Sequence, residues 1–119
     1  MELTDFNLGQ ESEKKNIKKH LPDQLTNPLI HIGGGHDHIF PFLMALGEKY
    51  PSHKFNIINI DAHLDTRDDQ HAHSGTPFRQ FFEQAKNDHD LHQIGILRES
   101  NPLGNFKELK NCKIGRAHV

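Results

Sequence analysis

The spacing of apolar residues along the chain predicts three strands. Residues 29–32 (LIHI) form a short strand-like run, and residues 55–60 (FNIINI) are rich in β-forming residues and predict a buried strand. Residues 93–97 (QIGIL) predict a third strand. Two further segments, 12–21 and 102–109, have the character of short helices near the two ends of the chain.

Helical spacing separates the predicted strands. A helix is expected from about His38 to Tyr50, where Pro51 ends it. Its apolar face consists of Phe42, Leu43, Leu46 and Tyr50. A second helix should begin at Thr76 and Pro77, a capping hydroxyl followed by proline in the first helical position. Four apolar residues recur at the spacing of one buried face of this helix: Phe78, Phe81, Phe82 and Ala85.

The order strand, helix, strand, helix, strand indicates an α/β fold. Right-handed crossovers join such strands into a parallel sheet with helices on both faces, a three-layer α/β/α arrangement. Ligands gather at the carboxyl ends of the strands in these sheets. Polar clusters follow the strands that end at Ile32 and Ile60, so we expect the functional site there. The polar residues 1–28 form a separate N-terminal segment before the α/β region, residues 29–113.

The composition excludes several classes of function. The 119 residues carry 14 Lys and Arg against 16 Asp and Glu, a formal charge of −2, whereas a nucleic-acid or membrane-surface binder would carry a basic excess. No stretch approaches the roughly 20 apolar residues of a membrane span. No secretory signal follows Met1. The single cysteine, Cys112, fits a reducing compartment, and we expect a cytoplasmic protein. The 11 histidines are the outlier of the composition.

The central motif, Asp61-Ala62-His63-Leu64-Asp65, directly follows the predicted buried strand. In extended backbone the side chains at i, i+2 and i+4 point to one side, so Asp61, His63 and Asp65 can converge. Two carboxylates and an imidazole suit a hard or borderline divalent ion, with Mn²⁺ as the first choice and zinc or iron as alternatives. A polar loop with one salt-bridged aspartate is the competing interpretation.

A second motif, Gly33-Gly34-Gly35-His36-Asp37-His38, follows the first predicted strand. His36 lies just past that strand, where it can face the same crevice as Asp61. Asp37 is expected to cap the following helix, and His38 to be a surface residue of its first turn. The glycines before a helix could also cradle a phosphate, but the acidic residues nearby would repel it.

The third motif, residues 71–77 (HAHSGTP), adds candidate catalytic groups. His73 is a candidate for a catalytic or substrate-binding role, and His71 could bind a metal ion. Arg67 lies two residues past Asp65. It either compensates the charge of the acidic cluster or clamps a carboxylate of a substrate.

Together these motifs resemble the ureohydrolase family of arginases, agmatinases and formiminoglutamases. The resemblance lies in residues 33–37 (GGGHD), 59–67 (NIDAHLDTR) and 73–78 (HSGTPF). It implies an arginase-like fold and a site for two Mn²⁺ ions. One ion would be held by His36, Asp61 and Asp65, and the other by Asp61 and His63, so that Asp61 bridges them. Water activated between the ions would attack a guanidinium or formimino carbon and release urea or formamide.

Two details make the chain more similar to the formiminoglutamase branch, which converts N-formimino-L-glutamate and water to L-glutamate and formamide. Arg67 stands where arginases and agmatinases usually have asparagine. Ser74 and Gly75 stand where those enzymes have a proton-shuttling histidine and glycine, which makes Ser74 and the neighbouring His73 the catalytic candidates. An agmatinase- or arginase-type guanidino hydrolase and a non-catalytic, His-rich metal-binding protein are the alternatives. The expected partner is a small-molecule substrate, and a homo-oligomer of the full-length form stays open.

The family's second carboxylate pair, S-x-D-x-D on a later strand, is absent from the sequence. We therefore interpret the chain as an incomplete, internal piece of a ureohydrolase and expect it to be inactive by itself. Residues 114–119 (IGRAHV) match one reading frame of a widely used sequencing adapter, AGATCGGAAGAGCACACGTC. We hypothesise that they are a non-native tail; a genuine stop codon after Val119 in the source locus would contradict this.

Overall fold

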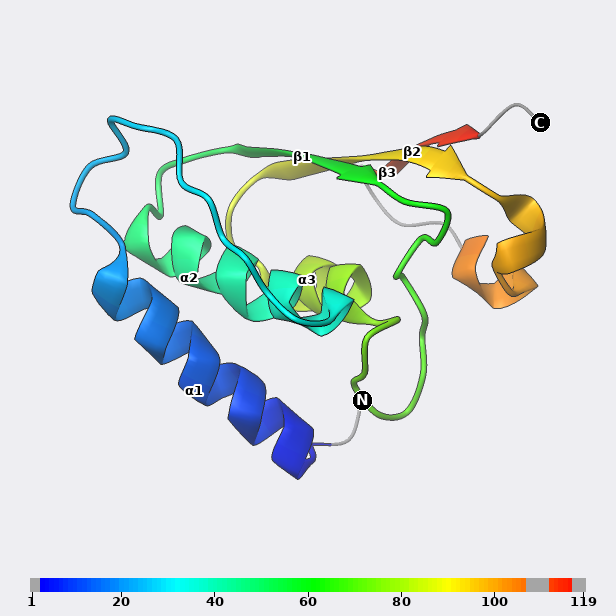
Figure 1. Cartoon of the computed structure of the whole chain (residues 1–119), viewed down its shortest axis with the longest axis horizontal. Helices are drawn as coiled ribbons and strands as arrows, with labels where there is room; N and C mark the ends of the chain where they lie inside the picture. Colours follow the sequence, from blue (N-terminus) through cyan, green and yellow to red (C-terminus); the bar gives the residue numbers. More distant parts are fainter. Residues whose placement is uncertain (1–2, 107–111, 117–119) are drawn as a thin grey trace.

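Three parallel strands form the sheet, and each pairs with its neighbour in the sequence (Figure 1). They are β1 (Phe55–Ile60), β2 (His89–Ile96) and β3 (Cys112–Arg116). The computed structural model describes residues 3–106 and 112–116. A bulge interrupts the pairing of β2 with β3 at Gly95, whose φ of 86° is a conformation that glycine adopts without strain. The parallel α/β fold is confirmed, and so is the strand predicted at residues 55–60.

All α-helices among the described residues lie on one side of the sheet (Figure 1). They are α1 (Asp5–His20), α2 (Ile39–Lys49) and α3 (Pro77–Gln84). Shorter 3-10 helices are η1 (His36–His38), η2 (Arg98–Ser100) and η3 (Leu103–Phe106). On the opposite face of the sheet Ile58 is 63% and Ile60 79% exposed, so within residues 3–106 and 112–116 no second helical layer covers it. No described helix is both long and apolar enough to cross a membrane.

The hydrophobic core fills the space between the helices and the sheet. Its buried members are Phe40, Leu43, Phe78, Phe81 and Leu91. The face predicted for α3 is confirmed, because Phe78 and Phe81 are buried and the other two predicted residues, Phe82 and Ala85, pack against the cluster. Phe40 lies outside the face predicted for α2. This helix contacts both α1 and α3, so more than one of its faces is buried.

Residues 29–32, predicted as a strand, have no strand pairing in the structure. Ile30 and Ile32 are exposed, and the ring of His31 stacks on Phe42 of α2 with centroids 4.7 Å apart. A strand requires a neighbour that completes its hydrogen bonds, and this segment packs on α2 instead of joining β1. The residue types of this segment favour β structure, but none of the described strands pairs with it.

The helix starts also differ from expectation. A 3-10 turn precedes α2, His38 occupies its cap position, and no side chain caps it, so the capping role predicted for Asp37 is wrong. Thr76 is the cap residue of α3 and Pro77 follows it, as predicted. The Thr76 hydroxyl, however, donates to the carbonyl oxygen of His73 at 2.9 Å and caps no helix amide. The hydroxyl bonds to the loop before α3 because this loop folds back onto the start of the helix.

Other element bounds differ in length. The helix predicted at residues 12–21 begins earlier, at Asp5, and the strand predicted at 93–97 begins at His89. Only the 3-10 helix η3 is found in the segment 102–109, of which residues 107–109 lie outside the described part. In the proposed tail, residues 114–116 belong to β3 and residues 117–119 lie outside the described part.

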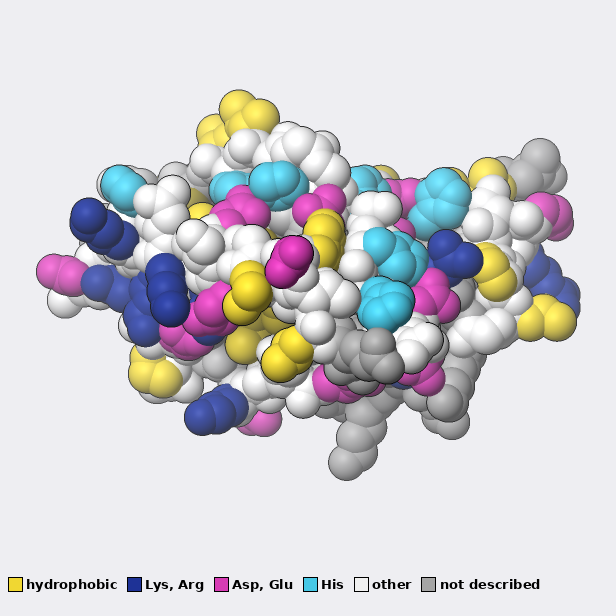
Figure 2. Space-filling model, turned by 90° about the horizontal axis from the view of Figure 1, so that it is seen from below, with side chains coloured by type: hydrophobic (Ala, Val, Ile, Leu, Met, Phe, Trp, Pro, Cys, Tyr) yellow, Lys and Arg dark blue, Asp and Glu magenta, His cyan; other side chains and the backbone are white. Residues whose placement is uncertain are grey.

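An ion-pair cluster joins α1 to α2. Lys14 Nζ lies 2.6 Å from Glu48 Oε1, and Lys18 Nζ lies 3.0 Å from Glu48 Oε2. Figure 2 shows Lys, Arg and acidic side chains gathered at one end of this face. The hydrogen bond from Lys14 is the main cause that lowers the pKa of Glu48. The polar helix α1 is thus held in place by charge as well as by packing.

The contribution of Glu48 to stability should depend on pH. Its folded-state pKa is lowered, so its contribution is full above the unfolded pKa of 4.5 and is lost as the pH falls through the folded pKa. Glu48→Gln should lower the free energy of unfolding by up to about 1 kcal/mol near neutral pH, because the pair is partly exposed, and should change nothing in strong acid. Denaturant unfolding at both pH values measures this. Glu83→Gln, at an exposed site on α3, is the control, and an equal loss in both variants would contradict the prediction.

Candidate metal centre

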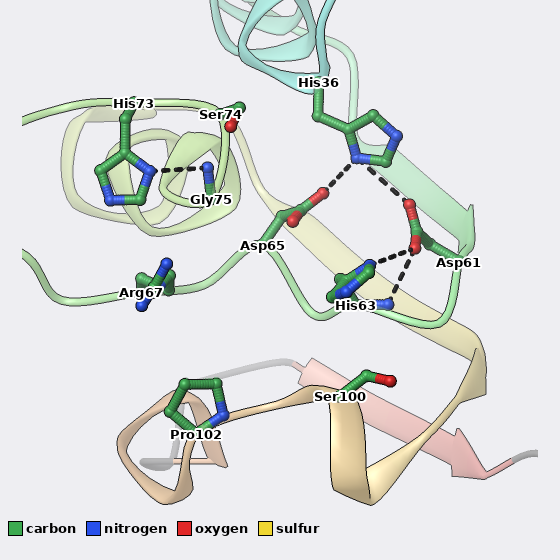
Figure 3. A pocket seen from close by; sticks show the side chains of 10 residues that line it. All are labelled: His36, Asp61, His63, Asp65, Arg67, His73, Ser74, Gly75, Ser100 and Pro102. Carbon is green, nitrogen blue, oxygen red and sulfur yellow. Dashed lines mark hydrogen bonds and ion pairs between the residues drawn. The ribbon is translucent and has the colours of Figure 1, made fainter.

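A polar pocket of about 730 Å³ lies where β1 and β2 end (Figure 3). It is lined by His36, Asp61, His63, Asp65, Arg67, His73, Ser74, Gly75, Ser100 and Pro102. Every residue that the sequence singled out for metal binding, substrate binding or catalysis lines it, with the exception of His71. The carboxyl end of the sheet is thus the place where the three motifs meet, as the topology predicts.

Three potential metal ligands converge in this pocket. The donor atoms of His36, Asp61 and Asp65 all lie within 4.8 Å of one another. The ring Nδ1 of His36 makes a short hydrogen bond with Asp65 and lies 3.2 Å from Asp61 Oδ2. Two carboxylates and one imidazole form an oxygen-rich ligand set, which fits Mn²⁺.

Asp61 presents its two carboxylate oxygens to different histidines. Oδ2 faces His36, while Oδ1 accepts the backbone N–H of His63 at 2.8 Å and lies 3.3 Å from its ring Nδ1 (Figure 3). The ring of His63 lies outside the group of three converging ligands. Asp61 therefore stands between His36 and His63 with one carboxylate oxygen toward each, an arrangement that suits a bridging carboxylate.

Asp65 reaches the pocket from a turn. Its φ of 52° lies in the left-handed region, which aspartate tolerates better than most residues. Its carbonyl oxygen accepts the backbone N–H of Phe78 at 3.1 Å, which ties the turn to the start of α3. Of the three side chains of the D-x-H-x-D motif that were expected to converge, Asp61 and Asp65 do so, together with His36, while the ring of His63 lies outside this group. A turn brings the two carboxylates together in place of the alternation of an extended strand.

Two buried amide side chains hold the backbone of this loop. Gln93 of β2 donates to the carbonyl oxygen of Leu64 at 2.6 Å and accepts from Asn59 at 2.7 Å. Asn101 accepts the backbone N–H of Leu64 at 2.9 Å and donates to the carbonyl oxygen of Ala62, also at 2.9 Å. Sequence analysis missed both residues, because an amide side chain far along the sequence gives no signal of which loop it will contact.

Arg67 and His73 share a partner, Asp69. Arg67 Nε lies 3.4 Å and His73 Nε2 2.7 Å from Asp69 Oδ2. The other ring nitrogen of His73 accepts the backbone N–H of Gly75 at 3.0 Å, so both nitrogens are engaged. A Cβ at position 75 would lie 2.8 Å from Arg67 Cδ, so a larger residue there would displace the Arg67 side chain. The catalytic roles of His73 and of the exposed Ser74 stay predictions. In the structure, the two hydrogen bonds of His73 hold this loop in place. Sequence analysis missed Asp69, although this residue lies close to both Arg67 and His73 along the sequence.

The negative charge of the site acts on His36. The hydrogen bond with Asp65 is the largest cause that raises the pKa of His36, and the charges of Asp65, Asp61 and Asp37 add to it, while burial opposes it. A cation is therefore favoured at this position, whether it is a proton on the imidazole or a metal ion between the three ligands.

Removal of the Asn101 amide should loosen the pocket. Asn101→Ala leaves the backbone N–H of Leu64 without its partner and removes one of the two donors to the carbonyl oxygen of Ala62, which should lower the free energy of unfolding by about 1–3 kcal/mol. Mn²⁺ should also bind more weakly, because the loop between Asp61 and Asp65 is no longer fixed. Urea unfolding and the electron paramagnetic resonance of free Mn²⁺ measure the two effects. Asn56→Ala on the exposed face of β1 should change neither, and equal Mn²⁺ affinity in all three chains would refute the role of Asn101.

Comparison with solved structures agrees with this architecture. The crystal structure of formimidoylglutamase from Bacillus subtilis subsp. subtilis str. 168 superposes with a TM-score of 0.78 at 21% identity, over 98% of this chain and 37% of that one. Trypanosoma cruzi formiminoglutamase with Mn²⁺ superposes with a TM-score of 0.67 at 21% identity, over 97% of this chain and 40% of that one. At this identity the likeness establishes the fold.

Sequence comparison supplies the family. Over 83 residues the chain is 41% identical to formimidoylglutamase of Staphylococcus aureus (strain JH9), a stretch that covers 70% of this chain and 26% of that protein. The matched stretch thus corresponds to about a quarter of the relative's length. The model of the Arginase family matches residues 5–118, nearly the whole sequence. The chain belongs to the arginase family.

Proposed function

We propose that this chain is part of a manganese-dependent hydrolase that cleaves N-formimino-L-glutamate with water to L-glutamate and formamide. The observation that carries the proposal is the position of Asp61, between His36 and Asp65 on one side and His63 on the other. The match to formimidoylglutamases supports the choice of substrate over agmatine or arginine.

The ligand sets for two ions follow from this position. His36, Asp61 and Asp65 would hold one Mn²⁺ ion, and Asp61 and His63 would contribute to the other. When bound, Mn²⁺ supplies Lewis-acid activation of water at neutral pH, the chemistry needed to hydrolyse a C–N bond. The donor set supports this assignment, and the crystal structure of T. cruzi formiminoglutamase, which shares the fold, was solved with Mn²⁺.

The residues beyond the metal ligands would bind and orient the substrate. Arg67 lines the same pocket as the carboxylates and can pair with a carboxylate of the substrate. Asp69 restrains the guanidinium, so less freedom is lost on binding. Ser74 is exposed at the pocket wall, where its hydroxyl can hydrogen-bond the substrate. A substrate held at Arg67 would have its far end directed toward Asp61 and Asp65.

Replacement of the bridging carboxylate should abolish metal binding. In a chain extended to the length of its relatives, we expect two Mn²⁺ ions per wild-type chain and none in Asp61→Asn, because both ligand sets lose a member. Asp37→Asn is the matched control, since this carboxylate lies near His36 but outside the converging ligands, and it should keep both ions. Metal analysis after gel filtration measures the stoichiometry. Unchanged Mn²⁺ content in Asp61→Asn would refute the bridging assignment.

Replacement of Arg67 should distinguish the substrate classes. In the same extended chain, Arg67→Asn should lower kcat/KM for N-formimino-L-glutamate by about 10- to 150-fold, the equivalent of about 1.5–3 kcal/mol for a charge-assisted pair. Inhibition by agmatine, which has no carboxylate, should change little. Formamide release and inhibition constants are the measurements. An equal loss for both compounds would mean that Arg67 acts on the metal site, and no release by the wild type would contradict the proposed function.

A further inference from the structure

A second group of potential metal ligands lies outside the pocket, between α1 and the segment that leads into η1. It consists of Glu13 on α1, His31, and His38 at the end of η1, whose donor atoms all lie within 4.8 Å of one another. The ring Nδ1 of His38 lies 2.5 Å from Glu13 Oε1. None of the three lines the pocket around Asp61. The ligand group thus shares no residue with the candidate metal centre, although both border one neighbouring pocket.

Packing holds the two histidines of this group in place. The ring of His31 lies flat on Phe42, with an interplanar angle of 12°, and its centroid is 6.3 Å from that of His38. A Cβ at Gly33 would lie 2.9 Å from the Cβ of His38, so the glycine lets the backbone pass close over this side chain. Within the described part of the chain, the ring nitrogens of His31 have no hydrogen-bond partner. Both nitrogens of the exposed His31 ring are therefore available to a ligand from solution.

We propose that Glu13, His31 and His38 bind a divalent transition-metal ion of the zinc type. Two imidazoles and one carboxylate form a nitrogen-rich set, whereas the pocket around Asp61 is oxygen-rich and suits manganese. Tetrahedral bonds of about 2.0–2.1 Å place zinc ligands roughly 3.3 Å apart. The donor atoms already lie within 4.8 Å of one another, close to this spacing. The exposed position of His31 leaves room for water as the fourth ligand.

The bound ion would link α1 to the turn that carries His36. The helix η1 contains only His36, Asp37 and His38, so an ion on its last residue restrains the same turn that presents His36 to the pocket. Gln10 of α1 already contacts this turn through the carbonyl oxygen of Asp37 at 3.5 Å. Figure 2 shows histidine and acidic side chains next to one another on this side of the molecule. The metal would replace a single His38–Glu13 contact with a three-ligand connection.

Zinc titration of the 119-residue chain tests the site. The background variant carries His36→Asn and Asp61→Asn, which removes the ligands of the pocket and makes the result independent of the proposed function. Competition with a chromophoric chelator should give one Zn²⁺ per chain, and zinc should raise the midpoint of thermal unfolding. His31→Ala in this background should weaken zinc binding at least tenfold. His53→Ala, at an exposed histidine between α2 and β1, is the matched control and should leave it unchanged.

Glu13→Gln provides a second variant that keeps the size of the side chain. The amide oxygen can still accept a hydrogen bond from His38 but is a weak zinc ligand, so zinc affinity should fall while the far-UV circular dichroism of α1 is retained. Absence of a bound ion in the background variant would overturn the proposal. Zinc affinity that is equal in the background, His31→Ala and Glu13→Gln chains would also overturn it, because the ion would then be held elsewhere.

Discussion

The candidate site depends on the hydrogen bonds that two buried amides make to one turn. Gln93 and Asn101 contact the backbone on both sides of Leu64, whose side chain is fully buried. A buried peptide group without a partner costs about 1–3 kcal/mol, so these contacts favour the turn that gives Asp65 its positive φ. Burial of Leu64 pulls the chain inward, and the amides satisfy the polar backbone that is buried with it. The carboxylates on either side of this leucine then both face the pocket.

This turn brings two negative charges close together, those of Asp61 and Asp65, and the imidazole of His36 lies against both of them. The pKa of this histidine is raised because hydrogen bonding to Asp65 stabilises its charged form. Arg67 and Asp69 form a separate pair at the other side of the pocket, which leaves the acidic pair with histidine as its neighbour. A metal ion therefore competes with a proton for the same position, and the arrangement that favours one favours the other.

The sequence predicted those features of the structure that local residue patterns control. The strand 55–60, the buried face of α3 and the gathering of the three motifs at one sheet edge all follow from periodicity and element order. It did not predict what depends on a distant partner. Asp37 caps no helix because a 3-10 turn precedes α2, and residues 29–32 form no strand because they pack on α2. Gln93 and Asn101 were missed for the same reason, since nothing near them in the sequence indicates the loop that they hold.

The turn His36–His38 connects the two ligand groups in a way that its geometry explains. A 3-10 helix has three residues per turn, so residues two apart point in different directions. His36 accordingly faces Asp61 and Asp65, while His38 faces Glu13 of α1. The carbonyl oxygen of Asp37, between them, accepts from Gln10 of α1. The polar helix α1 thus contacts the turn that presents a pocket ligand. A shift of α1 along α2 would therefore move this turn and, with it, the side chain of His36.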